Sequence, residues 1–461
     1  MDRTSGFIRL KMKKFVFSPL MFGLLGFPAG VFFFLARILD IDLFWFNYLY
    51  MVKLRLRAGY QAGMFSYVND KEAVSRGVEK LKKIEKNVLY AVSRIGADIA
   101  GPPEAGKNPL DTLFLTSFIY GTGGHTRLLQ TYVSHMENSK LLVTGRYSSR
   151  RAYDPRLQSE AGKGFPRGRI LMKQGRGGNF RSEVSGIYGE LSGLAPKKLV
   201  LFNHPADMGL LVAALLYAAK RKDLTVAYYH HADDYMPFLG SFFSCHIDLD
   251  ANQDKKCGQV PRRELIRIST RNRVQRPEEA PCPDLFTAFS FVPVSKIAGE
   301  DGKADGYASL VRDLGGRGIG TIMATSRGEG ALLRDILERN RCRQDLIEVD
   351  EDCSDISKYA GRVHAYLDTF PVGGGMSVVD GLSMGLPVMI LDAENHQIFR
   401  DPALARFTFS SAGDILKYAG EMAADCGFYD RQRAAAHDTY RNYYSEETMV
   451  EKLSGALEKK W

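Results

Sequence analysis

Two blocks of alternating strand-like and helix-like segments constrain the fold of this chain more than any other feature. In the first block, apolar runs predict strands at 113–120, 141–144, 199–203 and 225–230, and helical patterns lie between them at 126–135 and 208–221. In the second block, strands are expected at 286–292, 320–325, 346–349, 364–367 and 388–391, with helices at 307–314, 331–341 and 377–384. Alternation of this kind is typical of parallel sheets covered by helices. The sequence therefore predicts an α/β protein with two Rossmann-like domains in tandem.

The same patterns divide the 461 residues into segments. We expect a hydrophobic segment at 1–60, a helical connector at 61–108, a first Rossmann-like domain at 109–260, a linker at 261–283, a second Rossmann-like domain at 284–425, and a helix that crosses back over both domains at 426–461. A glycine-rich basic stretch at 145–183 is either a loop near an anionic partner or a solvated insertion.

The N-terminal segment is basic and contains a long uncharged run. Residues 1–60 carry nine Lys or Arg against three acids, which supplies six of the nine net positive charges. Residues 15–36 are uncharged, and about 20 apolar residues are enough to cross a bilayer as a helix. We expect this hydrophobic helical segment to attach the chain to the cytoplasmic side of the inner membrane, because basic residues precede it and no cleavage site follows. Prolines and glycines interrupt the run, so a span, a one-leaflet attachment and a buried hairpin all stay open.

A first glycine-rich turn follows the strand expected at 113–120. Gly123 and Gly124 allow close backbone approach, and the helix that follows offers unpaired N–H groups to an anion. His125 and Arg127 come directly after the glycines, and His125 is expected to point toward a ligand. The complete GxGxxG spacing of dinucleotide-binding proteins is absent, which disfavours a nicotinamide enzyme.

A second polar motif, at 228–234, ends the strand expected at 225–230. Neighbouring residues in a strand point to opposite faces, so His230 and His231 are not expected to share a metal ion. We expect no metal site here. His231 and Asp233 are instead candidates for acid/base chemistry or for contacts with substrate hydroxyls.

The third motif, at 364–388, contains the most informative residues. A strand is expected to end at Asp368, and a triple glycine then leads into a helix. Backbone amides, a hydroxyl group and the helix dipole together suit a diphosphate, and an acid one turn further on can accept hydrogen bonds from ribose hydroxyls. The candidate residues are Gly373, Gly374, Gly375, Met376, Ser377 and Asp380.

At these residues the chain resembles the GT-B glycosyltransferases, which have two facing Rossmann-like domains and an interdomain cleft. Within that group it is most similar to the family of the O-GlcNAc transferase and the bacterial adhesin glycosyltransferases. The resemblance covers about 110–425 and implies an acceptor domain at 109–260 and a donor-binding domain at 284–425. It also implies that Lys296, at the end of the motif 289–296, stabilises the leaving nucleoside diphosphate.

The resemblance also assigns the other candidate residues. It places Ser377 at the diphosphate, Asp380 at the ribose and His125 on the acceptor side. The sequence departs from retaining members, which carry two glutamates separated by seven residues, because Asp380 fills the second position but Val372 occupies the first. This departure favours an inverting reaction. No tetratricopeptide array precedes the catalytic part.

The function implied by the resemblance is transfer of a sugar from a nucleotide-sugar, UDP-linked, to a hydroxyl of a glycan, lipid-linked or protein acceptor. We expect a hexosyl or N-acetylhexosaminyl transfer without a metal or other cofactor, because fixed donors in a dry site can stabilise the leaving group. The charge beyond residue 60 is nearly balanced, which argues against nucleic acid as a partner. A sugar-nucleotide epimerase or hydrolase and a non-catalytic membrane-associated binding protein remain as alternatives.

Overall fold

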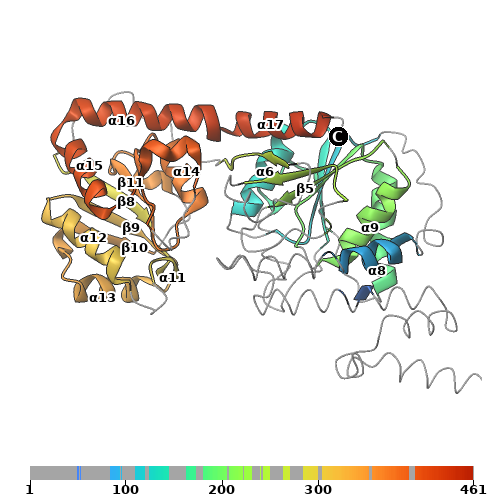
Figure 1. Ribbon diagram of the computed structural model, residues 1–461, viewed down its shortest axis with the longest axis horizontal. Coiled ribbons are helices and arrows are strands. Elements are labelled where there is room, and N and C mark those ends of the chain that lie inside the picture. The colour runs from blue at the N-terminus through green and yellow to red at the C-terminus, as the bar shows by residue number, and fades with distance from the viewer. Residues whose placement is uncertain are drawn as a thin grey trace, which may run out of the picture.

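The computed structural model contains two α/β domains with a helical stretch lying across both (Figure 1). The structure describes residues 49–50, 52, 82, 84–93, 95, 109–119, 124–144, 162–172, 180–204, 207–221, 223–230, 239, 242–249, 263–269, 284–298, 304–351, 356–393 and 400–459. The hydrophobic run at 15–36 and most of the connector expected at 61–108 lie outside these residues. Among the residues described, none of the helices is long and apolar enough to cross a bilayer.

The first domain is built on a parallel sheet. Within the described residues this sheet has the strand order β3-β2-β1-β4-β5-β6-β7. Its strands are β1 (Thr112–Thr116), β2 (Ser139–Val143), β3 (Ile170–Met172), β4 (Lys198–Leu201), β5 (Thr225–His230), β6 (Cys245–Asp248) and β7 (Arg263–Leu265). Its helices are α6 (Gly124–His135), α8 (Phe180–Leu194) and α9 (Met208–Ala219). All strands are parallel, but successive strands are added on one side of β1 up to β3 and on its other side from β4 onward. Ligands of doubly wound folds bind at the carboxyl ends of the strands where this order switches, here β1 and β4.

The second domain repeats this arrangement. In the part of the chain that the structure describes, its sheet is also parallel, in the order β10-β9-β8-β11-β12-β13. The strands are β8 (Thr287–Phe291), β9 (Gly320–Ala324), β10 (Ile347–Asp350), β11 (Ala365–Leu367), β12 (Val388–Leu391) and β13 (Thr408–Phe409). The helices are α11 (Val294–Ile297), α12 (Asp305–Gly316), α13 (Gly330–Arg339), α14 (Gly375–Ser383) and α15 (Ala412–Ala424). Here the order reverses between β8 and β11, which places their carboxyl ends at the expected ligand edge.

The central strands are buried on both faces, as parallel strands covered by helices must be. Every residue of β1 is buried, and so is every residue of β12. Helix α9 is apolar on all sides, and each residue from Met208 to Tyr217 is buried. Continuous apolar runs, rather than alternation, therefore located these elements in the sequence.

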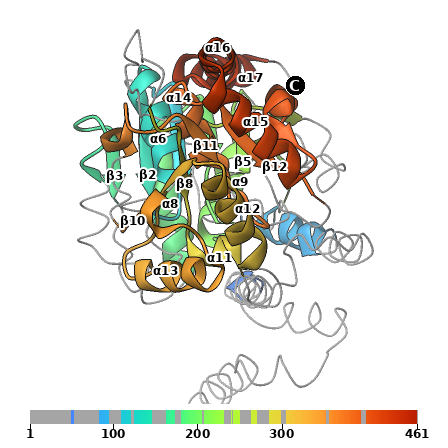
Figure 2. The same ribbon diagram turned by 90° about the vertical axis from the view of Figure 1, so that its left-hand side faces the viewer.

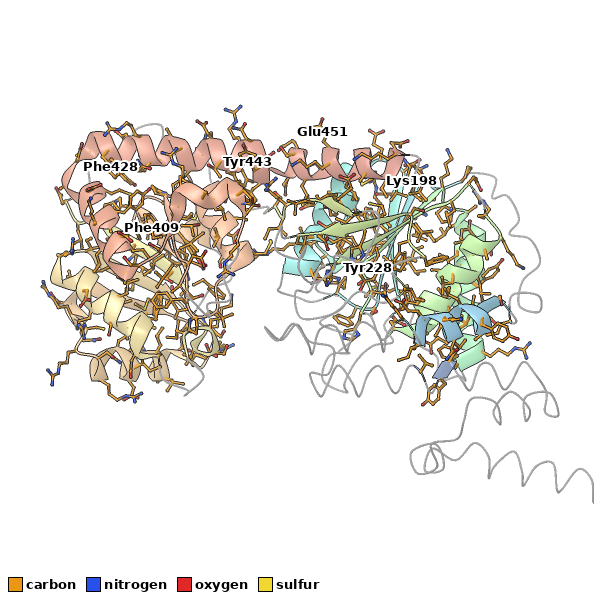
Figure 3. The ribbon with its side chains drawn as sticks, in the orientation of Figure 1. Lys198, Tyr228, Phe409, Phe428, Tyr443 and Glu451 are labelled. Carbon is orange, nitrogen blue, oxygen red and sulfur yellow. The ribbon has the colours of Figure 1, made fainter. Side chains whose placement is uncertain are left out.

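The C-terminal stretch ties the two domains together (Figures 1 and 2). It consists of α16 (Cys426–Thr439), a π-helical turn (Tyr440–Tyr444) and α17 (Glu446–Glu458). Helix α17 reaches the first domain, where Glu446 accepts a hydrogen bond from Thr131 Oγ1 at 3.3 Å. Tyr443, labelled in Figure 3 on the connecting turn, packs against the Arg267 guanidinium, which pairs with Asp401 of the second domain.

Several expected boundaries need correction. Strand β7 pairs with β6, so the first sheet extends into the linker expected at 261–283. Strand β3 and the start of α8 lie within the basic stretch at 145–183, which is therefore not wholly an insertion. The single helix expected at 426–461 is interrupted by the π-helical turn, and Ser445 caps α17 by accepting a hydrogen bond from the Thr448 amide at 3.2 Å. Short strands with charged residues give little sequence signal because apolar runs are what distinguish a strand.

Candidate functional site

The first turns of two helices, one from each domain, meet at the domain boundary. Helix α6 begins at Gly124, beyond the carboxyl end of β1, and α14 begins at Gly375, beyond the carboxyl end of β11. A Cβ atom on Gly124 would lie 2.9 Å from the Met376 Cγ atom, and Arg127 Nη1 lies 3.5 Å from Asp380 Oδ2. Helix N-termini carry partial positive charge and unpaired amides, so this boundary is suited to an anion.

The triple-glycine turn is held in place from beneath by Asp368. This residue follows β11 directly and is fully buried, and its Oδ1 accepts a hydrogen bond from the Gly374 amide at 3.0 Å. A Cβ atom on Gly374 would lie 2.1 Å from Ser377 Oγ and 3.4 Å from both Asp368 Oδ1 and Lys296 Nζ. Three polar groups thus converge on a position that only glycine leaves open.

Lys296 lies beside the same turn. It belongs to the short helix α11, which follows β8, and its Nζ donates a hydrogen bond to the Gly373 carbonyl at 3.3 Å. The Val372 amide in turn donates to the Lys296 carbonyl at 3.1 Å. Burial lowers the pKa of Lys296, and the nearby Asp368 carboxylate opposes that shift. A partly dehydrated ammonium group gains strongly from an incoming anion, because little of its water shell is left to remove.

Asp368 was not among the residues that the sequence singled out for the site. Burial raises its pKa from an ordinary 3.8 to about 7, although the Gly374 amide and Lys296 act in the opposite direction. Its place at the end of a strand, immediately before a glycine-rich turn, was visible in the sequence. Its burial was not visible, because it depends on the neighbouring strand and helix.

Replacing Asp368 with asparagine is expected to change how stability depends on pH. Between about pH 4 and pH 7 the native protein holds a proton on Asp368 that the unfolded chain has released, so the free energy of unfolding falls as the pH rises through this window. Asp368→Asn removes this loss and can still accept the Gly374 hydrogen bond. The measurement is the free energy of unfolding in urea. The value for the variant minus the value for wild type should be larger at pH 8 than at pH 5.

His125, whose pKa is lowered, makes the free energy of unfolding rise with pH in part of this window. This contribution is the same in wild type and in Asp368→Asn, so it cancels in the difference between them. The exposed Asp438 offers the matched control, since Asp438→Asn should show the same difference from wild type at both pH values. The same behaviour from Asp368→Asn would contradict the assignment of a buried, proton-binding carboxyl.

His125 lies in the first turn of α6 and is held against the ends of β1 and β4. Its Nε2 is 3.3 Å from the Phe202 carbonyl oxygen and 3.2 Å from Thr116 Oγ1. Because a carbonyl only accepts, Nε2 carries the hydrogen and Nδ1 is the basic nitrogen. Burial lowers the pKa of His125 to about 4, so the ring is neutral at pH 7.

The structure brings together some of the expected site residues. Lys296, Gly373, Gly374 and Ser377 surround one turn, and Met376 and Asp380 lie on the side of α14 that meets α6. Gly123, His231 and Asp233 lie outside the described residues. Sequence reasoning missed Asp368, and it did not foresee that Arg127 and Asp380 form an ion pair between the domains.

Comparisons by sequence find no relative. No protein-family model matches the chain, and no curated protein matches it either. Comparisons by structure match this chain to many solved structures.

Three of these solved structures show the extent of the similarity. An O-GlcNAc transferase from Thermobaculum terrenum superimposes with a TM-score of 0.51 at 12% identity, over 90% of this chain and 83% of that one. A glycosyltransferase from Rickettsia africae gives 0.56 at 11% identity, over 75% and 97%. HepE from Anabaena, solved in complex with UDP, gives 0.54 at 11% identity, over 75% and 99%. The structural neighbours of this chain are GT-B glycosyltransferases, and the chain has their fold.

Proposed function

We propose that this protein is a glycosyltransferase that transfers a sugar from a UDP-linked donor to a hydroxyl group of a glycan, lipid-linked or protein acceptor. One observation carries the proposal. The Lys296 ammonium and the Ser377 hydroxyl converge at the N-terminus of α14, which is the positive end of the helix dipole. This set of donors matches the diphosphate of an activated sugar in charge and in hydrogen-bonding capacity.

The donors act on the leaving group. As the bond between the anomeric carbon and the diphosphate breaks, negative charge grows on the phosphate oxygen, and Lys296 and Ser377 stabilise it together with the positive end of α14. These groups are fixed before the reaction begins, since the turn is bonded to Asp368 from below. Fixed donors of this kind can take the place of a divalent ion, so we propose transfer of a hexosyl or N-acetylhexosaminyl group without a metal.

Asp380 and Arg127 act next to the diphosphate. Asp380 is mostly buried on α14, one turn after Ser377, where its carboxylate can accept hydrogen bonds from ribose hydroxyls. Arg127 reaches it from the first domain at 3.5 Å. A bound nucleotide would therefore lie beside the ion pair between Arg127 and Asp380. It would contact both α6 and α14, the two helices that this ion pair joins.

The acceptor binds on the side of the first domain. His125 lies in the first turn of α6 with a neutral ring, and His231 and Asp233 follow β5 in the sequence. One of these groups removes the proton from the attacking hydroxyl in an inverting displacement. Val372, in the position where retaining enzymes carry a glutamate, supports inversion.

A thermal-shift panel of UDP-, GDP-, CMP- and TDP-sugars tests the proposal. UDP and one UDP-sugar should raise the melting temperature, since a ligand that binds only the native state stabilises it. The absence of a shift with every nucleotide would point to a non-catalytic protein. Consumption of the donor without any acceptor would point instead to a hydrolase or an epimerase.

We also propose that residues 1–60 attach the protein to the cytoplasmic face of the inner membrane. The support is the uncharged run at 15–36 with basic residues on either side. Deleting residues 1–50 should move the protein from the membrane fraction to the soluble fraction of a cell lysate. An unchanged membrane fraction would refute this attachment.

A further inference from the structure

Two histidines and an aspartate lie together in the interior of the first domain, away from the triple-glycine turn of the second domain. His230 is the last residue of β5, and Asp248, the last residue of β6, is its partner in the strand register. His246 lies two residues before Asp248 and so points to the same face of the sheet. All three side chains are buried: His230 is 1% exposed, Asp248 2% and His246 0%.

The separations within this trio suit ligands around a cation. Asp248 Oδ1 lies 3.4 Å from His230 Nδ1 and 3.7 Å from His246 Nε2, and one ligand atom from each residue lies within 4.8 Å of the others. Charge-assisted hydrogen bonds are usually shorter, about 2.7–2.9 Å. Ligand atoms at zinc distances of about 2.0–2.1 Å around a tetrahedral ion are separated by roughly 3.3 Å. His230 and Asp248 thus make only a long hydrogen bond, and the spacing of the trio is closer to that of a coordination shell than to that of strong hydrogen bonds.

The surroundings also favour a bound cation. Tyr228, labelled in Figure 3, precedes His230 on the same face of β5, and its ring meets the His246 ring edge-on at 5.2 Å. Phe243 stacks on Tyr228 at 5.0 Å. An aromatic wall lowers the local dielectric and makes a buried carboxylate costly, whereas a divalent ion offsets its charge.

We propose that His230, His246 and Asp248 bind one divalent cation of the zinc class. Two imidazole nitrogens and a carboxylate oxygen are ligands that Zn²⁺ accepts, and three protein ligands leave a further coordination position for water or another oxygen. The ion would link the carboxyl ends of β5 and β6, and His231 and Asp233 come directly after β5 in the sequence. It lies in the other domain from Lys296, so this site is independent of leaving-group stabilisation.

The tertiary structure supplies the ligands that the sequence reasoning lacked. Adjacent His230 and His231 point to opposite faces, and this argued against a metal at the motif 228–234. The partners of His230 come from β6, sixteen and eighteen residues further along the chain. Among the residues that the structure describes, His230, His246 and Asp248 form a group of histidine and acidic side chains close enough together to hold an ion.

Metal analysis of the full-length protein tests the proposal. After purification without chelators, elemental analysis should find about one zinc ion per chain, as expected for a closely spaced ligand set. The protein stripped with dipicolinate and supplied with Co²⁺ should show visible d–d absorption typical of a low-coordinate site. Less than about a tenth of an equivalent of metal in the wild type, together with no cobalt spectrum, would leave only a buried His–Asp hydrogen-bond network and overturn the proposal.

Substitutions locate the site. His246→Gln should lose the cobalt spectrum and at least about tenfold in metal affinity. His437→Gln, the same change on α16 of the second domain, should keep both. If His246→Gln does not fold, the near-isosteric Asp248→Asn provides the second test. A variant at His246 or Asp248 that folds and retains full metal content would also overturn the proposal. None of these measurements requires a donor sugar. The metal proposal can therefore fail or succeed independently of the proposed transfer reaction.

Discussion

Lys296→Ala is expected to lower sugar transfer about 10²- to 10³-fold, which is the usual effect of removing one fixed donor to developing negative charge. The lysine Nζ lies at the triple-glycine turn and is largely stripped of water, so its attraction to a departing diphosphate is poorly screened. The loss should appear mainly in kcat, because charge on the leaving oxygen is greatest in the transition state. Initial rates with the donor identified by the thermal-shift panel give the measurement.

Lys417→Ala is the matched control for this change. Lys417 is a lysine of the same domain, on α15, with a side chain that is 77% exposed. Both variants should melt within a few degrees of wild type. Wild-type turnover of a folded Lys296→Ala protein would mean that the lysine is a structural neighbour of the turn and that leaving-group stabilisation comes from elsewhere.

Gly374→Ala should weaken UDP binding by at least about 10²-fold while the domain stays folded. The backbone of Gly374, at φ −111° and ψ 107°, is accessible to alanine, so no strain arises from the main chain. The added Cβ would instead lie 2.1 Å from Ser377 Oγ. Rotation of the serine relieves the overlap but removes a hydroxyl donor, and the methyl group then occupies the space where the phosphate oxygens are expected.

Titration calorimetry with UDP measures this loss directly. The control is Gly316→Ala at the end of α12 in the same domain, where an added Cβ would meet nothing within 4 Å. That variant should bind UDP as wild type does. Retention of wild-type affinity by Gly374→Ala would show that the diphosphate does not lie against the triple-glycine turn.

The fold was largely predictable from sequence because its central strands are buried on both faces. Runs such as Thr225–His230 and Val388–Leu391 were predicted with the boundaries that the structure has. The strands that were missed, β3, β6, β7 and β13, have two to four residues each. They pair with strands already in the sheet, and backbone pairing rather than a long apolar run defines them.

The sequence by itself determined the triple-glycine turn at 373–375, because its glycines, hydroxyl and acid are close together along the chain and need only a strand and a helix around them. The tertiary structure decided everything that depends on distant segments. It buried Asp368, brought Lys296 to Gly373 across 77 residues, and paired Arg127 with Asp380 across the domains. It also placed His246 and Asp248 beside His230. Sequence spacing predicts contacts within one element, whereas contacts between elements depend on strand order and helix packing, which the whole chain sets together.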